Sequence, residues 1–443
     1  MTIMLNSARD DHQKIVETGT LQKLADKALE IAQLHARSEI EIQGKSYPVL
    51  HVTNLNSFIE HVLEKRGLQR SDVIARLSLD FGQGSLKISL NIIDMVSQES
   101  IMQYGSKTRR LGEFKDSGVQ KIFILAEAEN LEESHEAFEK LFELINVGDT
   151  EFTNACDFKA GNILAGISTA MAAYSCLYCE ALNDRDGHGL ETLGDMRTIQ
   201  NVTDNYEAWI RAKANTSKTQ HKKDLRIYKS CVNKPILFGK PTDQILQHIA
   251  PGELHIHLGL TDYLIKRIRR IWHQVDKWLD EIGIARNQYG THNLNGNHCQ
   301  IILEHADQLQ NVQKFEVQPF AETFRALRKV IHTCFGMELV EGWEANIKEF
   351  ALTWAKLVDF FDTYPFEEPQ TKIMYTEKVH VLIHHVPQYC KMYNTGLGVW
   401  AEQAGESLHS KRRKHKEFYR NVPKHIVEDP ELCCLVDFNS KQI

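Results

Sequence analysis

The sequence predicts an α/β protein in which a sheet-based core is interrupted by a long all-α insertion. Three observations lead to this prediction. Apolar residues alternate on both sides of a glycine-rich turn near residue 83, which is typical of a β-hairpin. Helical periodicity then dominates from about residue 190 to 375. A final helix is expected near residues 402–420, and it must return to the sheet for the core to close.

Residues 1–70 are expected to form a helical region for dimerisation or DNA binding. Apolar residues recur at helical spacing between residues 10 and 45, with Ile15, Leu24 and Ile31 among them. Residues 55–66 predict a second helix.

The hairpin begins the core. Leu77, Leu79 and Phe81 alternate with polar residues before Gly82-Gln83-Gly84, and a second alternating run follows. The next elements are a strand at 121–126, a helix at 131–145, a strand at 152–156 and a helix from residue 161. This order is typical of an RNase H-like nuclease domain. Its first part is assigned to residues 71–175, and its last helix and tail to residues 391–443.

Residues 176–390 are assigned to the all-α insertion. Two apolar stripes at helical spacing mark its expected core. They comprise Leu264, Ile268, Ile271, Val275 and Leu279, and Trp343, Ile347, Phe350, Trp354, Leu357 and Phe361.

The composition is that of a globular protein, with 42% hydrophobic and 25% charged residues. No apolar run reaches the roughly eighteen residues that predict a transmembrane helix. The net charge of −7 does not favour a nucleic-acid partner. Four basic clusters nevertheless suit either one basic groove or ordinary solvated faces. They are Lys107–Arg110, Lys218–Lys223, Lys266–Arg270 and Lys411–Lys416.

Three carboxylates stand where a divalent-metal site would need them. Asp80 lies near the end of the first core strand and Asp157 just after the fourth, so their oxygens could share divalent cations. The alternative is that each aspartate only caps a turn. Glu402 and Glu406 share one face of the expected last helix, and either could be the third ligand. An amphipathic helix with mixed charges would look the same.

A second candidate site has metal-ligand spacing. Cys176 and Cys179 have the separation of half a zinc knuckle, and His380 and His385 could supply the other half. His384 competes for the histidine role. The alternative for the cysteines is a pair of buried thiols.

These signals fall in the order of one known family. Trp400–Ser407 resembles the Trp-Ala…Glu-Ser motif of the Transib transposases and of the catalytic subunit of the V(D)J recombinase. His380–Pro387 resembles that family's histidine half-site, and Cys176 with Cys179 its cysteine half-site. Shorter likenesses occur at Asp80 with Gly82, Asp157 with Lys159, Tyr206 with Trp209, Leu254-His255 with Gly259, and Asn295-Gly296-Asn297. The resemblance covers roughly residues 70 to 420.

The resemblance implies a DDE-type DNA transposase or recombinase that nicks duplex DNA, makes a hairpin and transfers strands. It implies that Asp80, Asp157 and Glu406 hold two Mg²⁺ (or Mn²⁺) ions and that His255 acts near the scissile phosphate. It implies one structural Zn²⁺ on the Cys2His2 set. The expected partners are double-stranded DNA with terminal inverted repeats, a second copy of the chain and an accessory subunit, in the nucleus and without a membrane. The expected DNA-contacting residues are Lys107, Arg109, Arg110, Lys159, Lys411, Arg412, Arg413 and Lys414.

The sequence also departs from the family. Residues 1–70 are short for both a dimerisation region and a domain that reads transposon ends, and Phe158 stands where the V(D)J protein has an acidic residue. Two other interpretations therefore stay open: a domesticated, transposase-derived DNA-binding protein without catalytic activity, and a zinc-stabilised helical interaction module. A metal-dependent nuclease assay separates them from the active enzyme.

Overall fold

The computed structural model divides the chain into two compact units. The first, here called the sheet unit, comprises Met1–Cys156 and Glu402–Ile443, and the second, the helical unit, comprises Asp157–Ala401. The structure describes residues 30–82, 84–94, 122–148, 150–168, 172–184, 187–213, 225–287, 290–366, 372–401, 408, 412–417 and 429–442. Among these residues, no helix combines the length and apolar character that crossing a membrane requires.

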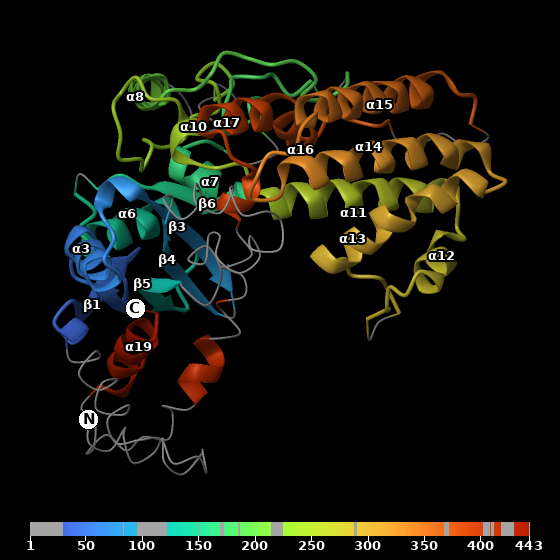
Figure 1. Ribbon diagram of the computed structural model, residues 1–443. Helices are drawn as coiled ribbons and strands as arrows, with labels where there is room; N and C mark the ends of the chain where they lie inside the picture. The colour runs from blue at the N-terminus through green and yellow to red at the C-terminus, as the bar shows by residue number, and fades with distance from the viewer. Residues whose placement is uncertain are drawn as a thin grey trace, which may run out of the picture. The chain divides into compact units, whose positions relative to one another are not determined.

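The sheet unit is built on a six-stranded mixed sheet (Figure 1). Its strands are β1 (His35–Ile42), β2 (Lys45–Val52), β3 (Val73–Gly82), β4 (Ser85–Asp94), β5 (Phe123–Glu129) and β6 (Thr153–Cys156). They are ordered β1-β2-β5-β4-β3-β6, with β3 and β6 parallel and the other neighbours antiparallel. The same unit contains η1 (Arg70–Asp72), α3 (Leu55–Arg66), α6 (His135–Leu144) and α19 (Pro430–Ser440). The α/β class, the β3–β4 hairpin and the predicted order of core elements are confirmed.

The prediction of a helix up to residue 45 is wrong from residue 35 onward, because β1 and β2 form a hairpin that extends the sheet. Gln43 and Gly44 at its turn have φ values of 51° and 75°. Positive φ at both central residues gives the tight turn that matches strand twist. Buried and exposed side chains then largely alternate along β1, so the helical spacing of Ile31 has no continuation. The second predicted helix, α3, is confirmed.

One row of side chains crosses the sheet on a single face. Asp80 pairs with Lys87, Lys87 with Glu127, Glu127 with Leu50, and Leu50 with Arg37. Residues directly opposite each other on neighbouring strands project to the same side of a sheet. The row therefore joins the candidate metal ligand Asp80 to the centre of the sheet.

The described C-terminal residues cover the face that carries this row. Leu408 lies in a buried apolar cluster with Leu50 of the row and Leu435 of α19. Arg412 Nε donates to Glu127 Oε2 over 2.9 Å. Residues 412–417 are helical, so the expected return of the chain end to the sheet is borne out for this segment.

The opposite face of the sheet is covered by α3. Phe58 of α3 meets the ring of Phe123 edge to face, with centroids 5.3 Å apart. A register shift next to Ile88 allows Ile124 and Glu127, an odd number of residues apart, to face the C-terminal residues together. The sheet is consequently buried on both sides, so that polar as well as apolar residues of β4 are buried.

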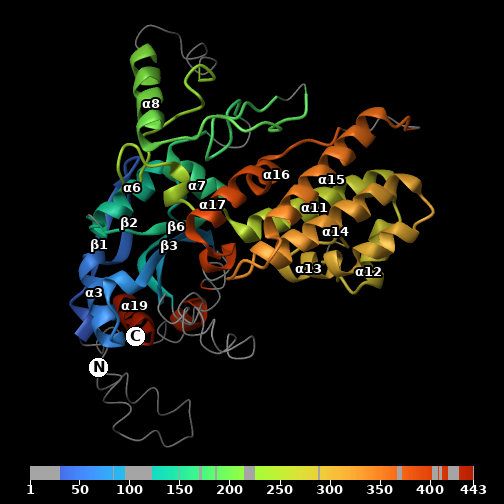
Figure 2. The ribbon, with the colours of Figure 1, turned by 45° about the horizontal axis from the view of Figure 1, so that its top comes forward.

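The helical unit contains α7 (Phe158–Ala165), α8 (Ile199–Lys213), α10 (Ile245–His248), α11 (Glu253–Ile271), α12 (Val275–Glu281), α13 (Gly296–His305), η3 (Ala306–Asn311), η4 (Phe315–Val317), α14 (Gln318–Cys334), α15 (Trp343–Thr363), α16 (Glu377–His380), η5 (Val381–His385), α17 (Val386–Tyr393) and η6 (Leu397–Trp400). Helices α11, α14 and α15 lie side by side (Figures 1 and 2).

Trp354 and Leu357 of the second predicted stripe are buried in α15. The first stripe is divided between α11 and α12, because the backbone becomes extended at Trp272. The unit begins at residue 157, earlier than the predicted boundary at 176.

Candidate metal centre

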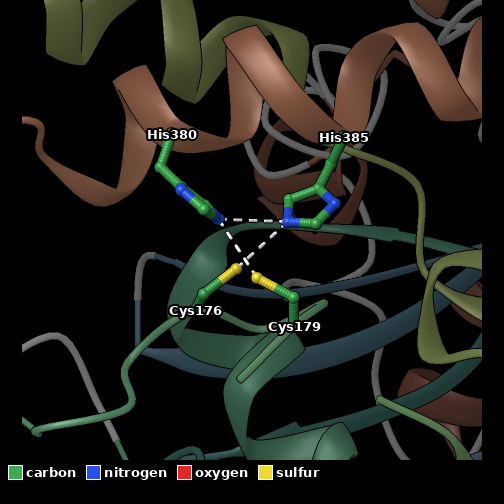
Figure 3. A group of neighbouring side chains, drawn as sticks. All are labelled: Cys176, Cys179, His380 and His385. Carbon is green, nitrogen blue, oxygen red and sulfur yellow. Dashed lines mark hydrogen bonds between the residues drawn. The ribbon is translucent and has the colours of Figure 1, made fainter. Parts of the chain in front are cut away.

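Four predicted ligands from distant parts of the helical unit converge on one buried point. The ligating atoms of Cys176, Cys179, His380 and His385 all lie within 4.8 Å of one another, and all four residues are buried. Figure 3 shows the two sulfurs and two imidazole nitrogens pointing toward each other. Sγ of Cys179 lies 3.2 Å from Nε2 of His380, and Sγ of Cys176 lies 3.4 Å from Nε2 of His385. The two Nε2 atoms are 3.2 Å apart.

These separations suit a tetrahedral zinc ion. With about 2.3 Å to sulfur and about 2.0–2.1 Å to nitrogen, the edges of such a site measure roughly 3.3–3.8 Å. The distance of 3.4 Å lies within this range, and the two distances of 3.2 Å lie just below it. The side chains present therefore fit a Cys2His2-bound structural metal such as zinc, with all four positions filled by protein.

A π-turn brings the two histidines to one side of their helix. At about 100° per residue, side chains five positions apart in an α-helix point roughly 140° apart. Between His380 and His385 the backbone instead forms the π-helical segment η5, in which the N–H of Val386 donates to the carbonyl of Val381. The wider turn largely removes this angular offset. The local helix geometry thus places a pair with four intervening residues on one ligating face.

Hydrogen bonds at the far ring nitrogens orient both histidines. Nδ1 of His380 lies 3.0 Å from the carbonyl oxygen of Leu190, and Nδ1 of His385 lies 3.3 Å from Oε1 of Gln388. Each of these acceptors requires a protonated Nδ1, which leaves the Nε2 lone pair directed at the cluster. Burial also lowers the pKa of His385, which favours its neutral form. Two neutral Nε2 lone pairs facing each other would repel, and a shared cation relieves that repulsion.

The pKa values of the two cysteine side chains are shifted in opposite directions. Burial raises the pKa of Cys176 well above its usual value. The hydrogen bond from the Cys176 thiol lowers the pKa of Cys179, against the effect of burial. A metal ion that displaces the remaining proton would take both sulfurs as thiolates.

His384 is not part of the cluster. Its Nε2 lies 3.2 Å from the carbonyl oxygen of Glu191, although its ring centroid is only 4.8 Å from that of His380. Sequence reasoning also missed two residues that support the ligands. Gln388 could have been suspected because it is a polar residue three positions after His385. Arg197, which donates hydrogen bonds to the carbonyl oxygens of Cys176 and Cys179, has no motif in the sequence that points to this role.

The predicted aspartates each follow one residue of a cross-strand pair, Asp80 inside β3 and Asp157 just after β6. Leu79 and Cys156, which precede Asp80 and Asp157, are register partners in the parallel β3–β6 pair. Asp157 is also the N-cap of α7, with its Oδ1 accepting the N–H of Ala160 over 2.7 Å. The capping role considered for this aspartate is thus present. It does not exclude metal binding, because a carboxylate has several acceptor positions on two oxygens.

Several predicted site residues lie outside the described part of the chain. They are Glu406 and its rival Glu402, and the basic residues Lys107, Arg109, Arg110 and Lys411. Lys159, Arg413 and Lys414 are exposed, and His255 is half-buried in the first turn of α11. Their roles toward DNA stay predictions.

The prediction that Arg412 contacts DNA is wrong, because its side chain is 1% exposed and paired with Glu127. Lys416 also contacts this carboxylate, with Nζ 3.0 Å from Oε1, and Lys87 lies 3.6 Å from the same oxygen. Burial alone would raise the pKa of Glu127, but Arg412, Lys416 and Lys87 together lower it to about 2. The basic run is therefore in part an internal anchor of the sheet unit.

Neither protein-family models nor curated proteins give a match to this sequence.

Proposed function

We propose that this chain is a metal-dependent DDE-type DNA transposase or recombinase stabilised by one structural zinc ion. The observation that carries the proposal is the parallel register of Leu79 with Cys156. The residues that follow this pair are Asp80, near the end of β3, and Asp157, directly after β6. The strand and helix order of the sheet unit supports an RNase H-like core.

The C-terminal residues support Glu406 as the third ligand. Leu408, two residues later, is packed into the sheet unit, and Arg412 is paired with Glu127. Glu127 is separated from Asp80 in the same cross-strand row by Lys87 alone. A segment fixed on this face is suitably tethered to supply a carboxylate beside Asp80.

In the proposed reaction, Asp80, Asp157 and Glu406 would hold two Mg²⁺ or Mn²⁺ ions through hard oxygen ligands. When bound, such ions activate a nucleophile and stabilise the leaving oxygen. Water adds to phosphorus as the bond to the 3′ oxygen breaks, which leaves a 3′-hydroxyl and a 5′-phosphate. That hydroxyl then attacks a phosphorus of the opposite strand, whose bond to its own 3′ oxygen breaks, so that a hairpin closes and a new 3′-hydroxyl is released. His255 would lie near the scissile phosphate. DNA, a second copy of the chain and the nucleus are part of the same proposal.

The test is a nicking assay on supercoiled plasmid with Mg²⁺ or Mn²⁺. Asp80→Asn and Asp157→Asn should abolish metal-dependent nicking and leave DNA binding intact. Asp72→Asn is the matched control, because Asp72 lies just before β3, at the opposite end of that strand from Asp80. DNA binding without nicking by the wild-type chain would favour a domesticated DNA-binding protein. Absence of both would favour the helical interaction module.

A further inference from the structure

Arg197 is a fully buried cation that holds the backbone of both cysteine ligands. Its Nε donates to the carbonyl oxygens of Cys176 and Cys179 over 3.0 and 3.1 Å. Its Nη2 donates to the carbonyl oxygens of Tyr174 and Lys229 over 3.1 and 3.0 Å. One guanidinium thus joins three residues of the cysteine segment to a separate turn of the chain.

The choice of arginine here is not explained by packing alone. None of the ion pairs found in the described part of the chain includes Arg197, so its charge is compensated by peptide carbonyls and by the Cys231 sulfur, 3.7 Å from Nη1. Burying an ion costs several kcal/mol unless its donors are satisfied. A planar group with five N–H donors can reach carbonyls in several directions at once, which a neutral side chain of similar size cannot do.

The backbone around Arg197 reinforces this arrangement. Its own N–H donates to the carbonyl of Tyr178 over 2.9 Å, and the N–H of Glu180 donates to Asp195 over 2.8 Å. A Cβ atom on Gly194 would lie 2.3 Å from the carbonyl carbon of Glu180, so glycine is needed for the two segments to approach. These backbone contacts therefore also fix the guanidinium relative to the cysteine segment.

On its other side, Arg197 reaches a turn with unfavourable backbone angles. Lys229 and Ser230 have φ values of 54° and 62°, in the left-handed region. Such residues persist where surrounding contacts determine them. Besides the bond from Arg197 to the Lys229 carbonyl, Ser230 Oγ accepts the N–H of Tyr174 over 3.1 Å. The turn and the cysteine segment consequently share two hydrogen-bonded connections.

We propose that Arg197 is a positioning residue for the metal centre and links its occupancy to the turn at residues 229–231. By fixing the peptide groups of Cys176 and Cys179, it holds their sulfurs at ligating separation and reduces the ordering that metal binding requires. The inference rests on the zinc part of the proposed function and is independent of DNA cleavage.

The test measures the Zn²⁺ affinity of full-length wild-type and variant chains by competition with a chromophoric chelator. Arg197→Gln should weaken binding about 10- to 100-fold, as loss of a supporting residue around metal ligands typically does. Arg197→Lys should recover only part of the loss, because an ammonium lacks the planar fork. Arg211→Gln on α8 is the matched surface control, with a side chain 71% exposed. Val330→Ala in the core of α14 controls for lost stability, and both controls should bind Zn²⁺ normally.

A second readout follows the turn. The Ser230 amide donates to the carbonyl of Leu225 over 3.0 Å, so its hydrogen exchange reports on the turn. Exchange should accelerate in Arg197→Gln and in the chelated wild type, and stay unchanged in Arg211→Gln. Unchanged exchange after chelation would overturn the link to the turn.

Wild-type Zn²⁺ affinity in folded Arg197→Gln, judged by circular dichroism, would overturn the positioning role. If that variant does not fold, wild-type affinity in Arg197→Lys has the same consequence. A wild-type chain that binds no Zn²⁺ would refute the metal centre itself, and the inference with it.

Discussion

Replacing Glu127 by glutamine should destabilise the sheet unit strongly. Glu127 is 3% exposed, and its cationic neighbours lower its pKa from 4.5 to about 2. Because the folded pKa lies below the unfolded one, the contribution to stability is present above pH 4.5 and is lost as the pH falls toward 2. At 1.36 kcal/mol per pKa unit, the shift corresponds to about 3 kcal/mol. The lowered pKa of buried Lys87 acts in the opposite direction at neutral pH, so the net contribution is smaller.

The cost of the substitution exceeds this linkage value, because Glu127→Gln leaves buried cations without their carboxylate. Removing one partner of a buried ion pair typically costs about 3–5 kcal/mol. Arg412 has its guanidinium 2.9 Å from Glu127 and is itself 1% exposed, so it should carry much of the penalty. Arg412→Met in the Glu127→Gln background should therefore cost less than it does alone.

The assay is native-state hydrogen exchange of the amides in β4 and β5. Tryptophan fluorescence would report on the other unit, because all six tryptophans lie between residues 209 and 400. A loss of about 3–5 kcal/mol should speed globally protected amides by roughly two to four powers of ten. Glu129→Gln is the matched control: its carboxylate also contacts Lys416, but it is 55% exposed and should cost less than about 1 kcal/mol. Equal exchange in the two variants would refute the argument.

Three further outcomes are expected. Cys176→Ser should reduce bound zinc, measured by elemental analysis, from one ion per chain toward none, while His384→Ala retains it; zinc retained in Cys176→Ser would remove this residue from the site. Arg413→Glu combined with Lys414→Glu should weaken duplex binding and make the plot of log affinity against log salt less steep by about two units. An unchanged slope would place the DNA elsewhere. Gly194→Ala should lower the stability of the helical unit by about 1–3 kcal/mol in urea titrations followed by tryptophan fluorescence, because its Cβ has no room; wild-type stability would contradict the close approach.

The core elements were predictable because their pattern is local. Alternation around Gly82-Gln83-Gly84 determines the β3–β4 hairpin without reference to the rest of the chain. The first hairpin was missed because Gln43-Gly44 is not one of the most favoured sequences for a turn with two positive φ values. Apolar residues before this turn also matched helical spacing, and short apolar patterns do not distinguish a strand from a helix.

Residue type alone led to the prediction that Arg412 contacts DNA, whereas its side chain is buried. In sequence it belongs to a run of basic residues, which predicts a solvent-exposed face toward phosphates. Its partner Glu127 is 285 residues away, and only the sheet register shows that this glutamate faces the returning C-terminal segment. Charge patterning gives the sign of a side chain, whereas its burial depends on long-range pairing.

At the metal centre, too, the residue types were predictable from the sequence, whereas the choice between neighbouring histidines depended on the backbone. Cysteine and histidine were recognisable as ligand types, but four intervening residues are unfavourable in an α-helix, where His380 and His384 would share a face. The π-segment η5 changes this by wrapping one additional residue into the turn, so that His385 faces the two cysteines and His384 turns to the Glu191 carbonyl. The pair of histidines that faces the cysteines is therefore selected by a backbone irregularity, which an ion shared by the two imidazoles would stabilise. A helix that regains regular α geometry after zinc removal would show that the metal maintains this turn.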